Sequence, residues 1–207
     1  MLFVTRSAYR SARPLAVAFF LWVLGLGALH AAGPGYTQIE DPAPVEAAQV
    51  VEYFWYGCPH CNALQVHIPA WKARLPQGVA LKLVPVALRP EWVDHARAFY
   101  AAEALGVLDG FHPALFRAIH EEKRDLDDAQ SLAAFAAEVA DVSAEAFSAA
   151  MQSDVVEARI LADIDVIQRL GLKTTPTLVI HGRYRITPDS AGGYAAMLAV
   201  ADRLLAE

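Results

Sequence analysis

The sequence predicts an α/β domain into which an all-helical block is inserted. Between residues 50 and 88, two runs of β-branched and aromatic residues flank a segment whose apolar residues recur at helical spacing. From about residue 90 to 170, Ala, Leu and Glu dominate and strand-forming residues become rare. Short strands return only near the end of the chain. The length of 207 residues suits one domain that carries an insertion.

Residues 1–32 have the layout of a secretory signal peptide. Arg6, Arg10 and Arg13 precede a largely apolar stretch over 15–29, and small residues follow. A retained membrane anchor is the alternative, although the apolar run is short for a membrane span. Removal of the leader takes three of the 17 basic residues and none of the 23 acidic ones, which leaves a net charge of about −9. We therefore expect no nucleic-acid partner.

The first half of the mature chain predicts a parallel β-α-β unit. An arm over 33–49 includes a short strand at 36–39, and the first confident strand covers 50–55. A helix is expected from Pro59 to about Leu75, where Pro76-Gln77-Gly78 ends it. The next strand covers 79–88. Parallel strands joined by a helix form a right-handed crossover.

Chain breaks divide the inserted block into four or five helices. The breaks are expected at Gly106, 110–113, 123–128 and 141–143, with Asp128 and Ser143 as N-caps. Strands at 177–180 and 184–186 then form a hairpin, and a closing helix covers about 190–205. The predicted parts are thus 33–89, the helical insertion 90–170, and 171–207.

Cys58 and Cys61 are the only cysteines of the chain. A structural disulfide across so short a loop would remove little entropy from the unfolded state. A zinc site needs about four ligands, and His67, His112 and His120 would have to converge from separate elements. The pair therefore indicates a reactive dithiol in an exported protein, and we expect no metal or other cofactor.

The surroundings of Cys58 predict a low thiol pKa. Cys58 falls at the N-cap of the expected helix and Pro59 at its first position. The free N–H groups of His60 and Cys61 and the helix dipole favour a thiolate, and the His60 ring, if cationic, adds to this. A low pKa stabilises the reduced form, so the disulfide oxidises other thiols. Cys61, one turn further on, is expected to be less exposed, to keep a higher pKa and to act as the resolving thiol.

The Cys58-Pro59-His60-Cys61 segment, preceded by an aromatic run, resembles the active site of the DsbA-like family of the thioredoxin superfamily. The resemblance implies a thioredoxin fold with an inserted all-helical subdomain and a strongly oxidising dithiol. It also implies that Thr175-Pro176 is a cis-proline loop whose backbone binds substrate peptide. Glu52 matches the buried acid that accepts the proton of the resolving cysteine, with a pKa raised by burial.

The function implied by this resemblance is that of a monomeric periplasmic dithiol oxidase. It would pass the Cys58–Cys61 disulfide to reduced, unfolded exported proteins and be reoxidised by a membrane quinone-linked protein resembling DsbB. Two residues depart from the family pattern: Thr175 replaces a common Val, and Gln65 replaces a common acid. A disulfide isomerase or reductase, which Thr175 favours, is one alternative, although no N-terminal dimerisation domain is expected. A peptide-binding chaperone module with incidental cysteines is the other.

Overall fold

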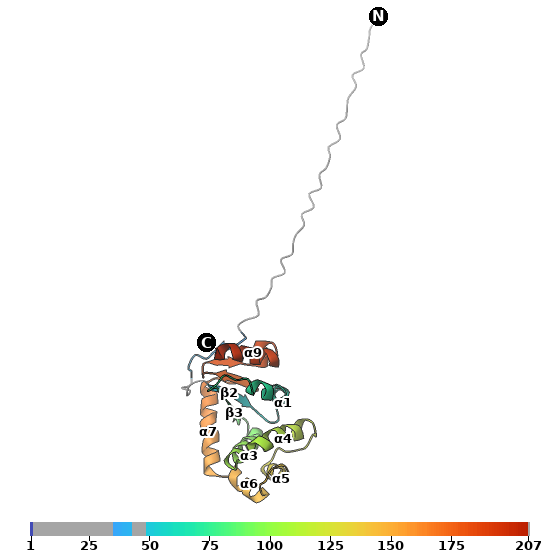
Figure 1. Cartoon of the computed structure of the whole chain (residues 1–207), viewed down its shortest axis with the longest axis vertical. Helices are drawn as coiled ribbons and strands as arrows, with labels where there is room; N and C mark the ends of the chain where they lie inside the picture. Colours follow the sequence, from blue (N-terminus) through green and yellow to red (C-terminus); the bar gives the residue numbers. More distant parts are fainter. Residues whose placement is uncertain (2–34, 43–48, 207) are drawn as a thin grey trace. The chain divides into compact units, whose positions relative to one another are not determined.

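The computed structural model describes residues 1, 35–42 and 49–206 (Figure 1). The predicted signal peptide lies outside these residues. Among the helices of the described residues, none is both long enough and apolar enough to span a membrane.

In the described residues, five strands form one mixed sheet in the order β1-β5-β4-β2-β3. Strand β2 is an inner strand: it runs parallel to β3, with Glu52 opposite Leu83, and antiparallel to β4. Its β-branched and aromatic residues suit a strand that is buried on both faces. The strands are β1 (Thr37–Gln38), β2 (Gln49–Phe54), β3 (Ala80–Pro85), β4 (Thr177–Ile180) and β5 (Tyr184–Ile186).

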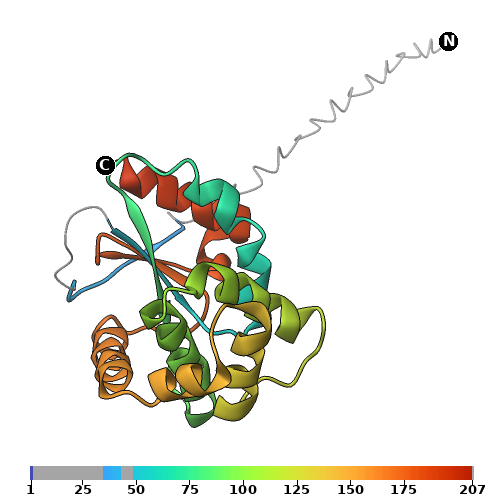
Figure 2. The same cartoon turned by 60° about the horizontal axis from the view of Figure 1, so that its bottom comes forward.

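Helices cover both faces of the sheet (Figure 2). On one face, α1 (Pro59–Gln65), α2 (Ile68–Lys72) and α9 (Tyr194–Leu205) pack through Leu64, Trp71 and Met197 against Val50 and Leu178. On the other face, α7 (Asp154–Arg169) packs against the alternate residues of the strands, among them Val51 and Val179. Successive side chains of a strand point to opposite faces of the sheet, so neighbouring residues of β2 and β4 contact different helices.

The inserted helices share a core with the end of β2. Phe54 and Tyr56 belong to the same buried cluster as Phe99, Phe111 and Phe116. The predicted α/β class with a helical insertion is therefore confirmed. The inserted elements that precede α7 are a 3-10 helix (Pro90–Trp92), α3 (Val93–Ala104), α4 (Leu108–His120), α5 (Ala129–Val139) and α6 (Ala144–Met151).

Both predicted N-caps are confirmed. The Asp128 side chain accepts hydrogen bonds from the backbone N–H groups of Gln130 and Ser131, at 2.8 and 2.9 Å. The Ser143 hydroxyl accepts one from Ala146 at 3.1 Å. The start of α7 at a third cap, Ser153, was not predicted.

Two predicted helices are each divided in the structure. The helix expected over 59–75 is wrong as a single element, because Pro69 cannot donate the backbone hydrogen bond that would carry α1 into α2. The helix expected over 190–205 is divided into α8 (Pro188–Ala191) and α9. Gly192 and Gly193, with φ of 87° and 127°, separate the two.

The break predicted at 110–113 is also wrong, because α4 continues through Gly110 and Pro113. Pro113 forgoes one backbone hydrogen bond, yet Phe111, Leu115 and Phe116 on the same helix are buried. Packing of this apolar face therefore outweighs the local cost of the proline.

Candidate active site

The dithiol lies where the inner strand β2 passes into α1. Cys58 is the N-cap of α1 and Pro59 occupies its first turn, as the sequence predicts. The Cys58 N–H donates to the Trp55 carbonyl at 3.1 Å, which closes the turn. Both cysteines are free thiols; Cys58 is 7% exposed and Cys61 is fully buried.

The two thiols have opposite pKa shifts. A hydrogen bond from the Cys61 thiol is the largest cause that lowers the pKa of Cys58, to about 5. Burial acts against this shift, while hydrogen bonds with Thr175 and with the backbone N–H groups of Cys61 and His60 reinforce it. Burial raises the pKa of Cys61 far above its ordinary value, and the charge on Cys58 adds to the rise. The predicted order of the two pKa values is confirmed.

The Thr175–Pro176 peptide bond is cis, as predicted. The Thr175 carbonyl accepts a hydrogen bond from the Cys58 thiol at 3.4 Å, across 117 residues of sequence. The loop before β4 thus faces the dithiol directly. Thr177 fixes this loop, since its buried hydroxyl donates to the Thr174 carbonyl at 2.7 Å.

Glu52 is fully buried on β2, on the strand that leads to the dithiol. Burial raises its pKa to about 8, and a hydrogen bond from Gln65 partly opposes the rise. Gln65 Nε2 donates to Oε1 at 3.1 Å, while Oε2 has no partner. The negative charge of Glu52, when present, raises the pKa of Cys61. The carboxyl is therefore near enough to act on the buried thiol.

His60 is exposed and hydrogen-bonded to α9. Its Nδ1 lies 2.8 Å from the Tyr194 hydroxyl. The effect of His60 on the Cys58 pKa comes from its backbone N–H. A cationic ring, which the sequence suggested as a further cause, is not among the causes of that shift.

Tyr56 anchors the inserted helices to the active-site turn, a role that the sequence left open. The Tyr56 hydroxyl lies 2.8 Å from His112 Nδ1, and its carbonyl lies 2.6 Å from His120 Nε2. Both histidines lie on α4, one turn on either side of Phe116. The sequence favoured a surface or partly packed role over metal binding for His112 and His120, because their spacing does not reveal a partner 56 or 64 residues away.

Trp55 lies beside the same turn and is only partly buried. Its indole Nε1 donates to His95 Nδ1 at 2.9 Å, and His95 Nε2 lies 2.8 Å from the Leu126 carbonyl. Gly57 is required here because a Cβ at this position would lie 2.3 Å from the Trp55 ring. The ring therefore packs on the backbone immediately before Cys58.

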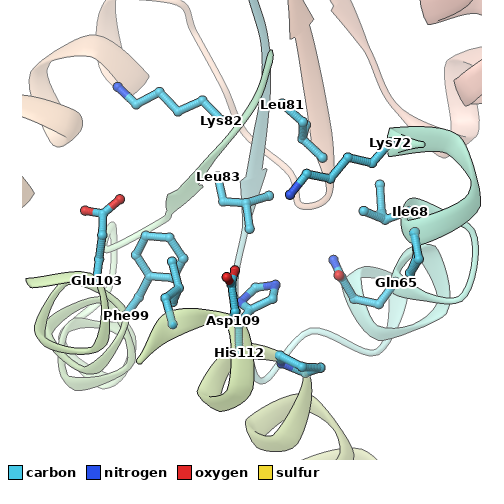
Figure 3. Close-up of a pocket in the computed structure, with 13 residues that line it drawn as sticks. Gln65, Ile68, Lys72, Leu81, Lys82, Leu83, Phe99, Glu103, Asp109 and His112 are labelled. Atoms are coloured by element: carbon cyan, nitrogen blue, oxygen red, sulfur yellow. The ribbon is translucent and has the colours of Figure 1, made fainter. Parts of the chain in front are cut away.

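A cavity of about 630 Å³ is lined by residues of α1, α2, β3, α3 and α4 (Figure 3). Gln65 and Lys72 project into it from one side, and Asp109 and His112 from α4. Burial and the nearby Lys72 lower the pKa of His112 to about 4, and His112 Nε2 has no partner. Gln65, which donates a hydrogen bond to Glu52, lines this cavity, whereas Cys58 and Cys61 do not.

A thiol of lowered pKa at a helix start, a second, buried thiol three residues on and a facing cis-proline loop define a class of protein: the thioredoxin-fold thiol:disulfide oxidoreductases. Comparison with known proteins narrows this class. The model of the DSBA-like thioredoxin domain matches residues 63–199. The chain belongs to this family.

Relatives and solved structures agree with this assignment. The chain is 34% identical to the thiol:disulfide interchange protein DsbA of Burkholderia cepacia, over 83% of this chain and 84% of the relative. The crystal structure of Pseudomonas aeruginosa DsbA matches with a TM-score of 0.77 at 32% identity, over 83% of this chain and 91% of that one. The crystal structure of DsbA from Xylella fastidiosa matches with a TM-score of 0.77 at 34% identity, over 83% and 94%.

Proposed function

We propose that the protein is an exported dithiol oxidase that donates the Cys58–Cys61 disulfide to folding proteins. A substrate thiolate attacks Cys58 Sγ, a mixed disulfide forms, and Cys61 leaves as a thiolate that takes up a proton. A second substrate thiolate then attacks the substrate sulfur of the mixed disulfide. The substrate leaves with its own disulfide, and the enzyme is left with two reduced cysteines.

The observation that carries this proposal is the low pKa of Cys58 beside the raised pKa of Cys61. Charge on the Cys58 sulfur exists only in the reduced form, and each pKa unit below ambient pH stabilises that form by about 1.4 kcal/mol. A pKa of about 5 therefore favours the reduced dithiol at neutral pH by about 3 kcal/mol, or roughly 60 mV for two electrons. The disulfide is correspondingly oxidising.

Glu52 is proposed to exchange the proton of Cys61. With a pKa of about 8, the carboxyl is mostly protonated at neutral pH. It can supply a proton when Cys61 leaves as a thiolate and take it back when the disulfide is remade. Thr175 and Pro176 are proposed to hold the substrate backbone against Cys58, because the Thr175 carbonyl already lies at the sulfur.

The proposed partners follow from the same chemistry. Reduced, unfolded exported proteins supply the substrate thiols, and a membrane quinone-linked protein resembling DsbB restores the disulfide. The predicted signal peptide supports a periplasmic location, which is also where the resemblance places the family. Mass spectrometry of the protein isolated from the periplasm would test removal of residues 1–32 or a closely similar segment.

The reduction potential tests the direction of the reaction. Equilibration with glutathione buffers should give a value well above the roughly −270 mV of thioredoxin. A value near that of thioredoxin would assign a reductase instead. The Cys58→Ala, Cys61→Ala variant should lose all activity toward reduced proteins; full retention would favour the peptide-binding chaperone alternative.

A further inference from the structure

A second cavity, of about 320 Å³, adjoins the cis-proline loop on the side of the inserted helices. Thr175 lines this cavity, and the same residue accepts the hydrogen bond from the Cys58 thiol. Thr175 therefore contacts both the Cys58 sulfur and this cavity. We call it the loop pocket; its lining residues are Val86, Leu88, Arg89, Trp92, Ile167, Leu172, Lys173, Thr174 and Thr175.

The loop pocket has an apolar floor and a cationic rim. Val86, Ile167 and Leu172 are buried beneath it, whereas Arg89 and Lys173 are exposed, and no acidic residue lines it. Arg89 has one distant ion pair, with Glu91 at 3.9 Å. Within the described part of the chain, Lys173 has no ion pair. Although the chain has a net charge of −6, this pocket next to the reactive thiol carries two cations that can pair with a carboxylate of a substrate.

The wall that carries Arg89 is held in place by other contacts. Trp92 stacks on Trp55 with ring centroids 4.6 Å apart, and the Arg89 guanidinium lies 5.4 Å from the Trp92 ring. Trp55 is in turn hydrogen-bonded to His95, which is bonded to the Leu126 carbonyl. The pocket is thus formed before a substrate arrives, which lowers the entropic cost of binding.

We propose that the loop pocket binds an acidic side chain of the substrate, within two residues of the cysteine that attacks Cys58. This proposal rests on the proposed function, because it needs a substrate backbone that lies along Thr175. An extended chain advances about 3.3–3.6 Å per residue, so a neighbouring side chain reaches the pocket. The methylene groups of Glu suit the apolar floor, and its carboxylate meets Arg89 and Lys173. The protein would then oxidise cysteines flanked by acids faster than those flanked by neutral residues.

Peptides with a single cysteine test this preference. The two peptides of a pair carry Glu or Gln at one position, up to two residues before or after the cysteine. Each peptide is mixed with the oxidised mature protein. For each peptide, the rate of mixed-disulfide formation is divided by the rate at which the same peptide reacts with glutathione disulfide. This normalisation corrects for the effect of a nearby carboxylate on the reactivity of the peptide thiol itself. At one or more positions the Glu peptide should react about three to five times faster, as expected for partly exposed ion pairs. Added salt should lower this ratio.

Variants locate the source of the preference. Arg89→Ala and Lys173→Ala should each lower the Glu-to-Gln ratio, and the double variant should bring it close to one. Glu91→Gln should raise it, because it frees Arg89. The matched control is Arg117→Ala, which removes an exposed, ion-paired cation on α4 and should retain the wild-type ratio.

Two failures have different meanings. A wild-type ratio near one at every position, or an equal loss of the ratio in Arg117→Ala, would overturn the role of the loop pocket. If neither the Glu nor the Gln peptide forms a mixed disulfide with Cys58, the proposed function itself would be wrong.

Discussion

Two cysteines three residues apart differ in chemistry because one faces a hydrogen-bonding loop and the other is enclosed. Cys58 receives hydrogen bonds at the start of α1, while Cys61 is buried beneath it. In the proposed mechanism, this asymmetry decides which sulfur a substrate attacks and which one must gain a proton on leaving. It is a property of single residues and can be measured residue by residue.

The ionisation of Cys58 is the first prediction at this scale. In the reduced protein, thiolate ultraviolet absorbance should appear with a midpoint near pH 5, while Cys61 stays protonated throughout the neutral range. Cys58→Ser should remove this transition, and Cys61→Ala should move it upward because the largest stabilising hydrogen bond is lost. A single transition at ordinary alkaline pH would contradict the mechanism.

Replacement of Glu52 by Gln gives the second prediction. The folded-state pKa of about 8 exceeds the ordinary 4.5, so the wild-type protein loses stability as pH rises through this interval. Glu52→Gln should therefore raise the free energy of unfolding of the oxidised protein by about 4 kcal/mol near pH 8 and by little near pH 4.5. Urea denaturation at both pH values measures this, with exposed Glu121→Gln as the control. An equal effect at both pH values would show that the carboxyl is not the cause.

At the scale of elements, α2 and α9 are joined through one carboxylate. Trp71 Nε1 and Arg74 Nη1 donate to the two oxygens of Asp202, each at 2.7 Å. Trp71 is almost fully buried, whereas Arg74 is exposed. The two bonds have the same length but different environments, so their contributions to stability should differ.

The third prediction separates these two bonds. Asp202→Ala leaves the buried indole N–H without a partner and should destabilise the protein by about 1–3 kcal/mol. Arg74→Ala removes only the exposed ion pair and should cost about 0–1 kcal/mol. Chemical denaturation measures both. Equal losses would mean that the surface ion pair, and not the buried indole, joins the helices.

The elements also show what a sequence can and cannot predict. Cys58, Pro59 and Thr175-Pro176 were located because short motifs specify their local backbone. The division between α1 and α2 was missed although Pro69 is a local signal for it. The continuation of α4 through Pro113 was missed because tertiary packing outweighs the local cost of that proline. The contacts of Tyr56 with His112 and His120 join positions 56 and 64 residues apart, and no local pattern encodes them.

For the whole molecule, two buried titratable groups, Glu52 and His112, change the stability in opposite directions as pH varies. Glu52 and His112 are both held neutral by burial. His112 and Gln65, the hydrogen-bond partner of Glu52, line the same cavity. The effects of Glu52 and His112 have opposite signs, because one group is an acid with a raised pKa and the other a base with a lowered pKa.

The fourth prediction concerns the pH profile that these two groups produce together in the oxidised protein, in which Cys58 has no thiol to titrate. The His112 pKa falls from 6.5 to about 4, so its contribution to stability is complete above about pH 6.5 and is lost as pH falls towards 4. The Glu52 contribution is complete below about pH 4.5 and is lost as pH rises towards 8. Between pH 4.5 and 6.5 the slopes of these two groups cancel, so their joint contribution to stability should be nearly level there and fall on either side.

Substitution of either group should expose the slope of the other. In Glu52→Gln, stability should rise from pH 4 to 6.5 by about 3 kcal/mol and then stay level. In His112→Phe, it should fall steadily from about pH 4.5 to 8, on top of a constant loss of about 1–3 kcal/mol because the Tyr56 hydroxyl loses its partner. The constant loss of stability reports the missing hydrogen bond of Tyr56, and the changed slope reports the titration of the substituted group. One set of denaturation curves therefore separates the two effects. A wild-type slope in either variant would show that its group does not titrate as its burial requires.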